Sequence, residues 1–261
     1  LGGLTIPFEF NNEKDFKIKF KKYLKTLSCV ILEPARTMHC DLKFVKTIRK
    51  YCSRYNIPLI FDEITLGWRY TLGGYHKILG VKPDIAVFSK GTTNGYPLGA
   101  IIGKKNVMKS AIDSFISSAY WTENIGFAAA IATINFMKKN DVARKLILKG
   151  KKIKKIWTDL GKENSLPILI RGIDSLPTFS FSSKHSDEMI TYFTQEMLKA
   201  GFLAHGQCYL MISHTDAQIK KYKNACSKVF KKISNIFHHN KFDFKKHLNG
   251  RVKFAKFKNP V

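Results

Sequence analysis

Three short apolar runs that end in charged residues constrain the fold of this chain more than any other feature. The runs are SCVILEP at residues 28–34, PLIFDEI at 58–64 and DIAVFSK at 84–90. Runs of this length, closed by a proline or a charge, are typical of strands buried in a sheet. A charge at the end of a buried strand is costly unless it is paired or takes part in chemistry. Asp62 and Lys90, near the ends of the second and third runs, are therefore candidate functional residues.

The segments between these runs have the pattern of helices. From residue 41 to 55, apolar residues recur at helical spacing with basic residues between them. A fourth apolar run, GAIIG at 99–103, follows a loop, and residues 124–139 form a stretch of small residues with strong helix propensity that can pack closely against a sheet. Strands that alternate with helices at these lengths predict an α/β fold with a mainly parallel sheet.

The pattern changes after about residue 145, which indicates a second domain. Its expected elements, in order, are a basic amphipathic helix to residue 160, strands within 167–182, a helix over 187–200 and a last long helix opened by a capping box at 215–218. We therefore predict a large α/β domain over residues 1–144 and a small α+β domain over residues 145–261.

Composition excludes several classes of protein. The apolar fraction of 44% is that of a globular protein. The formal net charge is +26, but the basic residues are spread over many segments without a recognisable motif, so we do not expect a nucleic-acid partner. We expect no membrane span and no metal site, and we expect the five cysteines to be free thiols of a cytoplasmic protein. The chain opens at Leu1 in residues that look like mid-domain sequence, which suggests that an N-terminal part precedes it.

The strand ends predict a particular chemistry. In open parallel sheets the ligand crevice lies at the carboxyl ends of the strands, so Asp62 and Lys90 can meet in one crevice. A pyridoxal-phosphate (PLP) enzyme needs such a pair: a lysine that forms a Schiff base and moves a proton, and a carboxylate against the pyridine nitrogen. Other phosphate sites fit less well, because no G-x-G-x-x-G follows a strand and the stretch from Gly99 to Lys105 lacks the P-loop spacing.

A long segment resembles the core of the class-III aminotransferases, particularly their glutamate-1-semialdehyde aminomutase-like branch. The segment is FDEITLGWRYTLGGYHKILGVKPDIAVFSKGTTNGYPLGAIIGKKNVM at residues 61–108. EPAR at 33–36, SSAYWTENIGFAAAIATI at 117–134 and AHGQCYLMISHTDAQI at 204–219 resemble further parts of that family. The resemblance implies a fold-type-I PLP-dependent transferase, with the C-terminal portion of the PLP-binding large domain in residues 1–144 and the small C-terminal domain in 145–261.

The resemblance also implies roles for individual residues. Lys90 would be the Schiff-base lysine and Asp62 the partner of the pyridine nitrogen. Ile64 would pack against one face of the ring. Thr122 resembles a threonine that reaches the phosphate of the neighbouring subunit, which implies a homodimer with shared active sites. A helix N-cap is the alternative for Thr122.

Other family-like residues have a structural alternative. Glu33 and Arg69 can simply brace the ends of the sheet, and a solvated basic residue is the simpler interpretation of Arg171. The family's upstream phosphate loop and second ring-stacking residue have no counterpart in this chain.

The function implied by the resemblance is an aminotransferase that passes an amino group from a small-molecule donor to a carbonyl acceptor through the Lys90 Schiff base. The segment at 207–209 lacks the acidic residue that we expect in a true aminomutase. Aminomutase activity therefore stays an alternative, and so does a non-catalytic basic binding protein with the same fold. Intact Asp62 and Lys90 argue against the latter.

Overall fold

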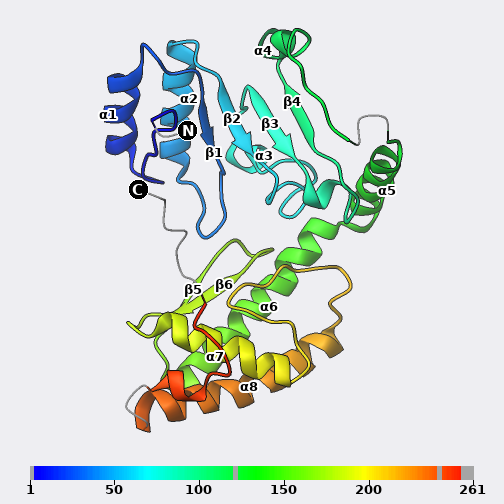
Figure 1. Ribbon diagram of the computed structural model, residues 1–261. Helices are drawn as coiled ribbons and strands as arrows, with labels where there is room; N and C mark the ends of the chain where they lie inside the picture. Colours follow the sequence, from blue (N-terminus) through cyan, green and yellow to red (C-terminus); the bar gives the residue numbers. More distant parts are fainter. Residues whose placement is uncertain (1–2, 120–122, 240–242, 254–261) are drawn as a thin grey trace. The chain divides into compact units, whose positions relative to one another are not determined.

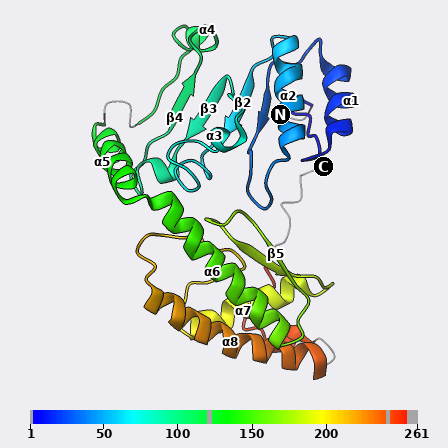
Figure 2. The same ribbon diagram turned by 180° about the vertical axis from the view of Figure 1, so that it is seen from behind.

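The computed structural model describes residues 3–119, 123–239 and 243–253 (Figure 1, Figure 2). The chain divides into two compact units, Leu1–Arg144 and Lys145–Val261, named unit 1 and unit 2 below. None of the helices in the described parts of the chain is both long enough and apolar enough to cross a lipid bilayer.

Unit 1 is built on one four-stranded sheet with the strand order β1-β2-β3-β4. The strands are β1 (Val30–Leu32), β2 (Leu59–Asp62), β3 (Ile85–Phe88) and β4 (Ala100–Gly103). β1, β2 and β3 run parallel, whereas β4 pairs antiparallel with β3. β4 can reverse direction because a loop with a short 3-10 turn, rather than a crossover helix, joins it to β3. The predicted α/β fold with a mainly parallel sheet is thus confirmed.

The helical elements of unit 1 are α1 (Glu13–Tyr23), α2 (Leu42–Arg54), α3 (His76–Leu79), η1 (Lys90–Thr92), α4 (Lys105–Met108), η2 (Lys109–Ala111) and α5 (Ile125–Asn140). α2 begins where the Asp41 side chain accepts hydrogen bonds from the backbone amides of Lys43 and Phe44, as an N-cap residue does. α1 and α2 lie side by side next to β1 in both views (Figure 1, Figure 2). Their shared core is aromatic and contains Phe16, Phe20 and Phe44.

The two faces of this sheet are not covered equally. One face is buried and carries Val30, Leu32, Leu59, Phe61, Ala86 and Phe88. The opposite face, on which the intervening residues lie, is less covered: Ile31 is 54% exposed, and Ile60 and Asp62 are half-buried. The apolar runs predicted buried strands, and one face of the sheet is buried as predicted whereas the opposite face is partly exposed. Asp62 therefore lies on the more accessible side of the sheet.

Helix α5 forms as predicted, but it packs less closely than its small residues suggested. Only Gly126 and Ala130 are buried, and a side chain on Gly126 would meet the backbone of Pro97 and the side chain of Leu98. Large apolar side chains on α5 and in the segment before it stay exposed: Ile112, Phe115, Ile116, Ile125, Phe127, Ile131 and Phe136. Exposed apolar surface of this extent is typical of a protein interface.

Unit 2 contains a two-stranded antiparallel sheet and three long helices. Its elements are α6 (Val142–Glu163, which begins in unit 1), β5 (Ile168–Arg171), β6 (Thr178–Phe181), α7 (Ser186–Lys199), α8 (Asp216–His239) and η3 (Phe244–His247). The core is aromatic, with the ring of Phe179 against those of Trp157, Phe193 and Phe230. The predicted capping box is confirmed: the Thr215 amide donates to Gln218 Oε1, and the Gln218 amide donates to Thr215 Oγ1.

Candidate active site at the carboxyl edge of the sheet

The residues predicted to carry chemistry lie at the edge where the three parallel strands end. The loops that follow β1, β2 and β3 gather at the arrowhead end of the sheet (Figure 1). Asp62 is the last residue of β2 and is paired with Val87 of β3, and the Glu63 amide donates to the Val87 carbonyl at 2.9 Å. Lys90 follows only three residues after Val87. Parallel pairing therefore brings Asp62 and Lys90 to the same edge.

Asp62 and Glu63 are adjacent acidic residues with different environments. Glu63 is fully buried, and its carboxylate accepts hydrogen bonds from the backbone amides of Tyr75 (2.8 Å) and His76 (2.9 Å). Asp62 is half-buried, and its Oδ1 accepts from the Ile64 amide at 2.9 Å. Glu63 therefore holds the start of α3 in place, whereas Asp62 is accessible and is oriented by its own turn.

Lys90 opens the 3-10 turn η1 in a conformation that is unusual for its residue type. Its φ is +44°, in the left-handed region that residues other than glycine seldom adopt. Its side chain is exposed, and Nζ donates a hydrogen bond to Thr65 Oγ1 at 3.0 Å. Strained backbone positions of this kind persist only where the surrounding structure enforces them, and they are found most often at functional sites.

The neighbouring turn, which contains Trp68, holds the turn at Lys90 in this conformation. Trp68 also has a positive φ, +69°, and its Nε1 donates to Thr92 Oγ1 at 2.9 Å. The Thr92 hydroxyl in turn donates to the Ser89 carbonyl at 3.0 Å, which closes the turn around Lys90. A side chain added at Gly91 would lie 3.2 Å from the Gly67 carbonyl, so the two turns are in close contact.

Glu33 follows β1 at the same edge, and Arg69 lies in the turn after β2. Burial raises the pKa of the Glu33 carboxyl above its usual value, and the neighbouring Arg36 guanidinium opposes this shift. The negative charge of Asp62 raises the pKa of Glu33 further. The Arg69 amide donates to the Leu66 carbonyl, and its side chain is half-buried.

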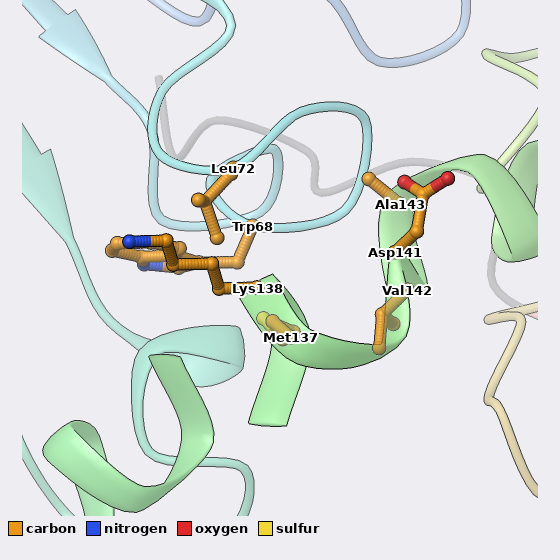
Figure 3. A pocket seen from close by; sticks show the side chains of 7 residues that line it. All are labelled: Trp68, Leu72, Met137, Lys138, Asp141, Val142 and Ala143. Atoms are coloured by element: carbon orange, nitrogen blue, oxygen red, sulfur yellow. The ribbon is translucent and has the colours of Figure 1, made fainter. Parts of the chain in front are cut away.

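Two cavities border this region of unit 1. A small one of about 140 Å³ lies between Trp68, Leu72 and the end of α5. Figure 3 shows the Lys138 side chain running along the Trp68 ring, with Asp141 at the other end of the pocket. A larger cavity of about 920 Å³ is lined by the N-terminal segment, α1 and β1, and it includes Glu33 and Arg36. The larger cavity thus extends to residues that follow β1.

Sequence reasoning predicted four site residues, and the structure places three of them. Asp62, Ile64 and Lys90 lie at the carboxyl edge, with Ile64 half-buried in the turn after β2. Thr122 lies outside the described residues. Arg171, which was left out of the predicted site, is an exposed residue in unit 2. The part of the chain that the structure describes contains no cluster of three or more histidine, cysteine or acidic side chains able to hold a metal ion.

Sequence reasoning missed Thr65, Trp68 and Thr92. Thr65 accepts a hydrogen bond from the Lys90 amine. Trp68 donates to Thr92, which donates to the carbonyl of Ser89, the residue before Lys90. Threonine and tryptophan in a turn carry no distinctive signal. An available clue was their place directly after strands that end at the predicted ligand edge.

Comparison with known proteins identifies the family. The family described as aminotransferase class-III matches residues 9–237. Glutamate-1-semialdehyde 2,1-aminomutase of Clostridium kluyveri is 30% identical over 244 residues, which cover 85% of this chain and 58% of the relative. The 3-aminobutyryl-CoA aminotransferase of Cloacimonas acidaminovorans is 30% identical over 184 residues, covering 67% of this chain and 44% of the relative. The chain thus spans about half of the length of these relatives.

Solved structures share the fold. The PLP internal aldimine form of the FumI protein from Sphingopyxis sp. MTA144 aligns with a TM-score of 0.84 and 23% identity, covering 90% of this chain and 58% of that one. An omega-transaminase from Sphaerobacter thermophilus aligns with a TM-score of 0.80 and 18% identity, covering 89% of this chain and 60% of that one. Because the family match extends over most of the sequence, the chain belongs to the class-III aminotransferases.

Proposed function

We propose that the chain is part of a PLP-dependent aminotransferase in which Lys90 holds the cofactor and Asp62 tunes it. The observation that carries this proposal is the arrangement at the sheet edge. An exposed amine and an accessible carboxylate follow adjacent parallel strands, and the amine is presented by a strained, hydrogen-bonded turn. Neither the strain nor the exposed amine contributes to packing, so a chemical role explains them better than a structural one.

The side chains present fit PLP. The cofactor has an aldehyde that an amine can capture, a pyridine nitrogen that a carboxylate can pair with, and apolar ring faces that an aliphatic side chain can cover. Lys90, Asp62 and Ile64 supply these three groups from one edge of the sheet. The relatives support this assignment, since the FumI structure contains PLP. When bound, PLP accepts electrons from the α-carbon of an amino donor.

The roles of the chain's own residues follow from this arrangement. Lys90 Nζ would bind the cofactor covalently and, when free, would move the proton of the donor's α-carbon. The negative charge of Asp62 would keep a proton on the pyridine nitrogen, and the bond from the Ile64 amide to Oδ1 fixes the direction of the carboxylate. Ile64 would cover one face of the ring.

The remaining features belong to the same proposal. Residues 1–144 would form the C-terminal portion of the PLP-binding large domain, and residues 145–261 the small C-terminal domain. The exposed apolar side chains of α5 and the segment before it support a homodimer, in which Thr122 would reach the partner's cofactor phosphate. The five cysteines are all free, as expected for a protein of the reducing cytoplasm.

Amino-group migration within one substrate is a second candidate. It is favoured by the aminomutase of Clostridium kluyveri among the relatives and uses the same lysine. The two activities differ in one requirement, because transamination consumes a separate carbonyl acceptor. Turnover that depends on an added α-keto acid would identify transamination, whereas complete turnover of an amino aldehyde without an acceptor would identify migration.

The proposed function is tested by locating the cofactor's attachment. Borohydride reduction of the PLP-loaded protein, followed by peptide mass spectrometry, should place a pyridoxyl group on Lys90. Lys90→Ala should lose both this label and amino transfer, whereas Lys105→Ala, which changes another exposed lysine of unit 1, should keep both. A label on a different lysine of the wild-type protein, with Lys90→Ala still active, would refute the assignment.

A further inference from the structure

The amine of Lys90 has a specific partner that lies on a different strand end. Its Nζ donates to Thr65 Oγ1 at 3.0 Å, across 25 residues of sequence. Thr65 is only 4% exposed, whereas Lys90 itself is exposed. A long, flexible lysine side chain loses side-chain entropy when it is held in one place, and a bond to a buried, rigid hydroxyl offsets that loss. The contact therefore fixes the position of an amine that would otherwise be mobile.

The turn that carries Lys90 is fixed independently of this contact. The Trp68 indole holds Thr92, and Thr92 holds the Ser89 carbonyl. Trp68 and Thr65 belong to the same loop after β2, so the loop holds both the backbone and the amine of Lys90. Loss of the Thr65 hydroxyl should therefore free the amine without releasing the turn.

We propose that Thr65 is a positioning residue that binds the Lys90 amine whenever that amine is free and holds it at the carboxyl edge for reaction. This inference rests on the proposed function, because it assigns Thr65 to the lysine that holds the cofactor. It concerns the stages in which Nζ is not bonded to cofactor, namely capture of PLP and proton movement. In these stages a fixed amine reacts faster at its target than a mobile one does, because the entropy of positioning has already been lost.

The test compares three variants in two measurements. Thr65→Val keeps the shape of the side chain and removes the hydroxyl, and Thr65→Ser keeps the hydroxyl. Thr158→Val is the matched control, since the Thr158 hydroxyl bonds only to the Lys154 carbonyl within its own helix of unit 2 among the bonds that the structure records for it. The first measurement is the rate at which acetic anhydride acylates Lys90 in the PLP-free protein, relative to the exposed Lys105 of the same sample. The second is the rate at which added PLP becomes attached to Lys90.

The two rates should move in opposite directions in Thr65→Val. The rate of Lys90 acylation should rise about tenfold because the amine is no longer bound to Thr65. The rate of PLP capture should fall about tenfold because the amine is no longer positioned for that reaction. Thr65→Ser and Thr158→Val should stay within about twofold of the wild-type protein in both measurements. A general loosening of the site would instead shift both rates in the same direction.

The remaining results decide separately on the role of Thr65 and on the proposed function. Unchanged rates in a folded Thr65→Val protein, or two rates that change in the same direction, would refute the role of Thr65. If Thr65→Val does not fold, the Thr65→Ser protein decides the role of Thr65. Altered rates of acylation and PLP capture in Thr65→Ser would refute that role, and wild-type rates would support it. A wild-type protein that attaches PLP elsewhere would refute the proposed function, while the acylation measurement would still decide whether Thr65 holds the amine.

Discussion

Both ends of the sheet in unit 1 carry charged groups, but the charged groups at the two ends have different environments. At the amino end, the Asp84 carboxylate is bonded to the Arg49 guanidinium (2.7 Å), the Lys104 amine (2.7 Å) and the Leu59 amide (2.8 Å). At the carboxyl end, Lys90 is exposed on a strained turn, and the carboxyl of Glu33 is buried enough to raise its pKa. The Asp84 charge at the amino end is thus neutralised by its partners, whereas the Lys90 amine at the carboxyl end stays exposed.

The pKa values of the two carboxyls express the same contrast. The bonds from Lys104, Leu59 and Arg49 together outweigh the effect of burial and hold the pKa of Asp84 below its usual value of 3.8. At Glu33 burial dominates, and the pKa is raised. A carboxyl whose pKa is lowered by folding stabilises the fold in its ionised form. A carboxyl whose pKa is raised by folding stabilises the fold in its protonated form.

The largest effect is expected for Asp62→Asn at the carboxyl end. The amide cannot keep a proton on the pyridine nitrogen, so amino transfer should fall by at least about a hundredfold. The fold should persist, because the amide oxygen of asparagine can still accept the bond from the Ile64 backbone. Single-turnover kinetics and thermal unfolding measure the two outcomes. Near-normal turnover would show that another group performs this task.

Asp84→Asn at the amino end should show the reverse behaviour. Removing this charge leaves Arg49 and Lys104 without their shared partner. The unfolding free energy should fall by about 2 to 3 kcal/mol, which is less than for a fully buried ion pair because Lys104 is partly solvated. Turnover per folded molecule should not change. Because the folded pKa is lowered, the stabilisation is complete above about pH 3.8 and is lost as the pH falls through the folded value. Urea unfolding at several pH values measures this loss. A variant as stable as the wild type at pH 7 would contradict the assignment.

Glu33→Gln should have the smallest effect, and it should raise the stability that Asp84→Asn lowers. The folded pKa of Glu33 is raised, so its favourable contribution is present below about pH 4.5 and is lost as the pH rises through the folded value. At pH 7 the neutral amide removes the cost of a buried carboxylate, and the protein should gain about 0.5 to 1 kcal/mol of stability. The gain should vanish in acid. A loss of stability at pH 7 similar to that of Asp84→Asn would mean that both ends of the sheet are built alike.

The pattern of apolar runs was sufficient to predict where the strands lie, although β3 ends at Phe88 and Lys90 belongs to the turn that follows it. β2 and β3 lie within the runs at 58–64 and 84–90, and the capping box at Thr215 opens α8 as expected. Local spacing determines these elements, because burial on a sheet face or helix face requires a particular periodicity. The parallel connection between β2 and β3 then brings Asp62 and Lys90 to one edge without further information.

The polar groups that meet at that edge could not be predicted from the sequence and follow from the tertiary structure. Asp62 and Glu63 are equivalent in the sequence, yet one is accessible and the other is buried against the start of α3. Likewise the partner of the Lys90 amine, Thr65, and the link from Trp68 to Thr92 depend on turns with positive φ at residues other than glycine. These turns are held by side chains 24 and 25 residues apart, so no local pattern encodes them. The pattern of the sequence predicted the edge of the sheet at which Asp62 and Lys90 lie, because burial on a sheet face requires a local periodicity. The partner and direction of each side chain at that edge depend on contacts between residues that are distant in the sequence and meet only in the folded chain.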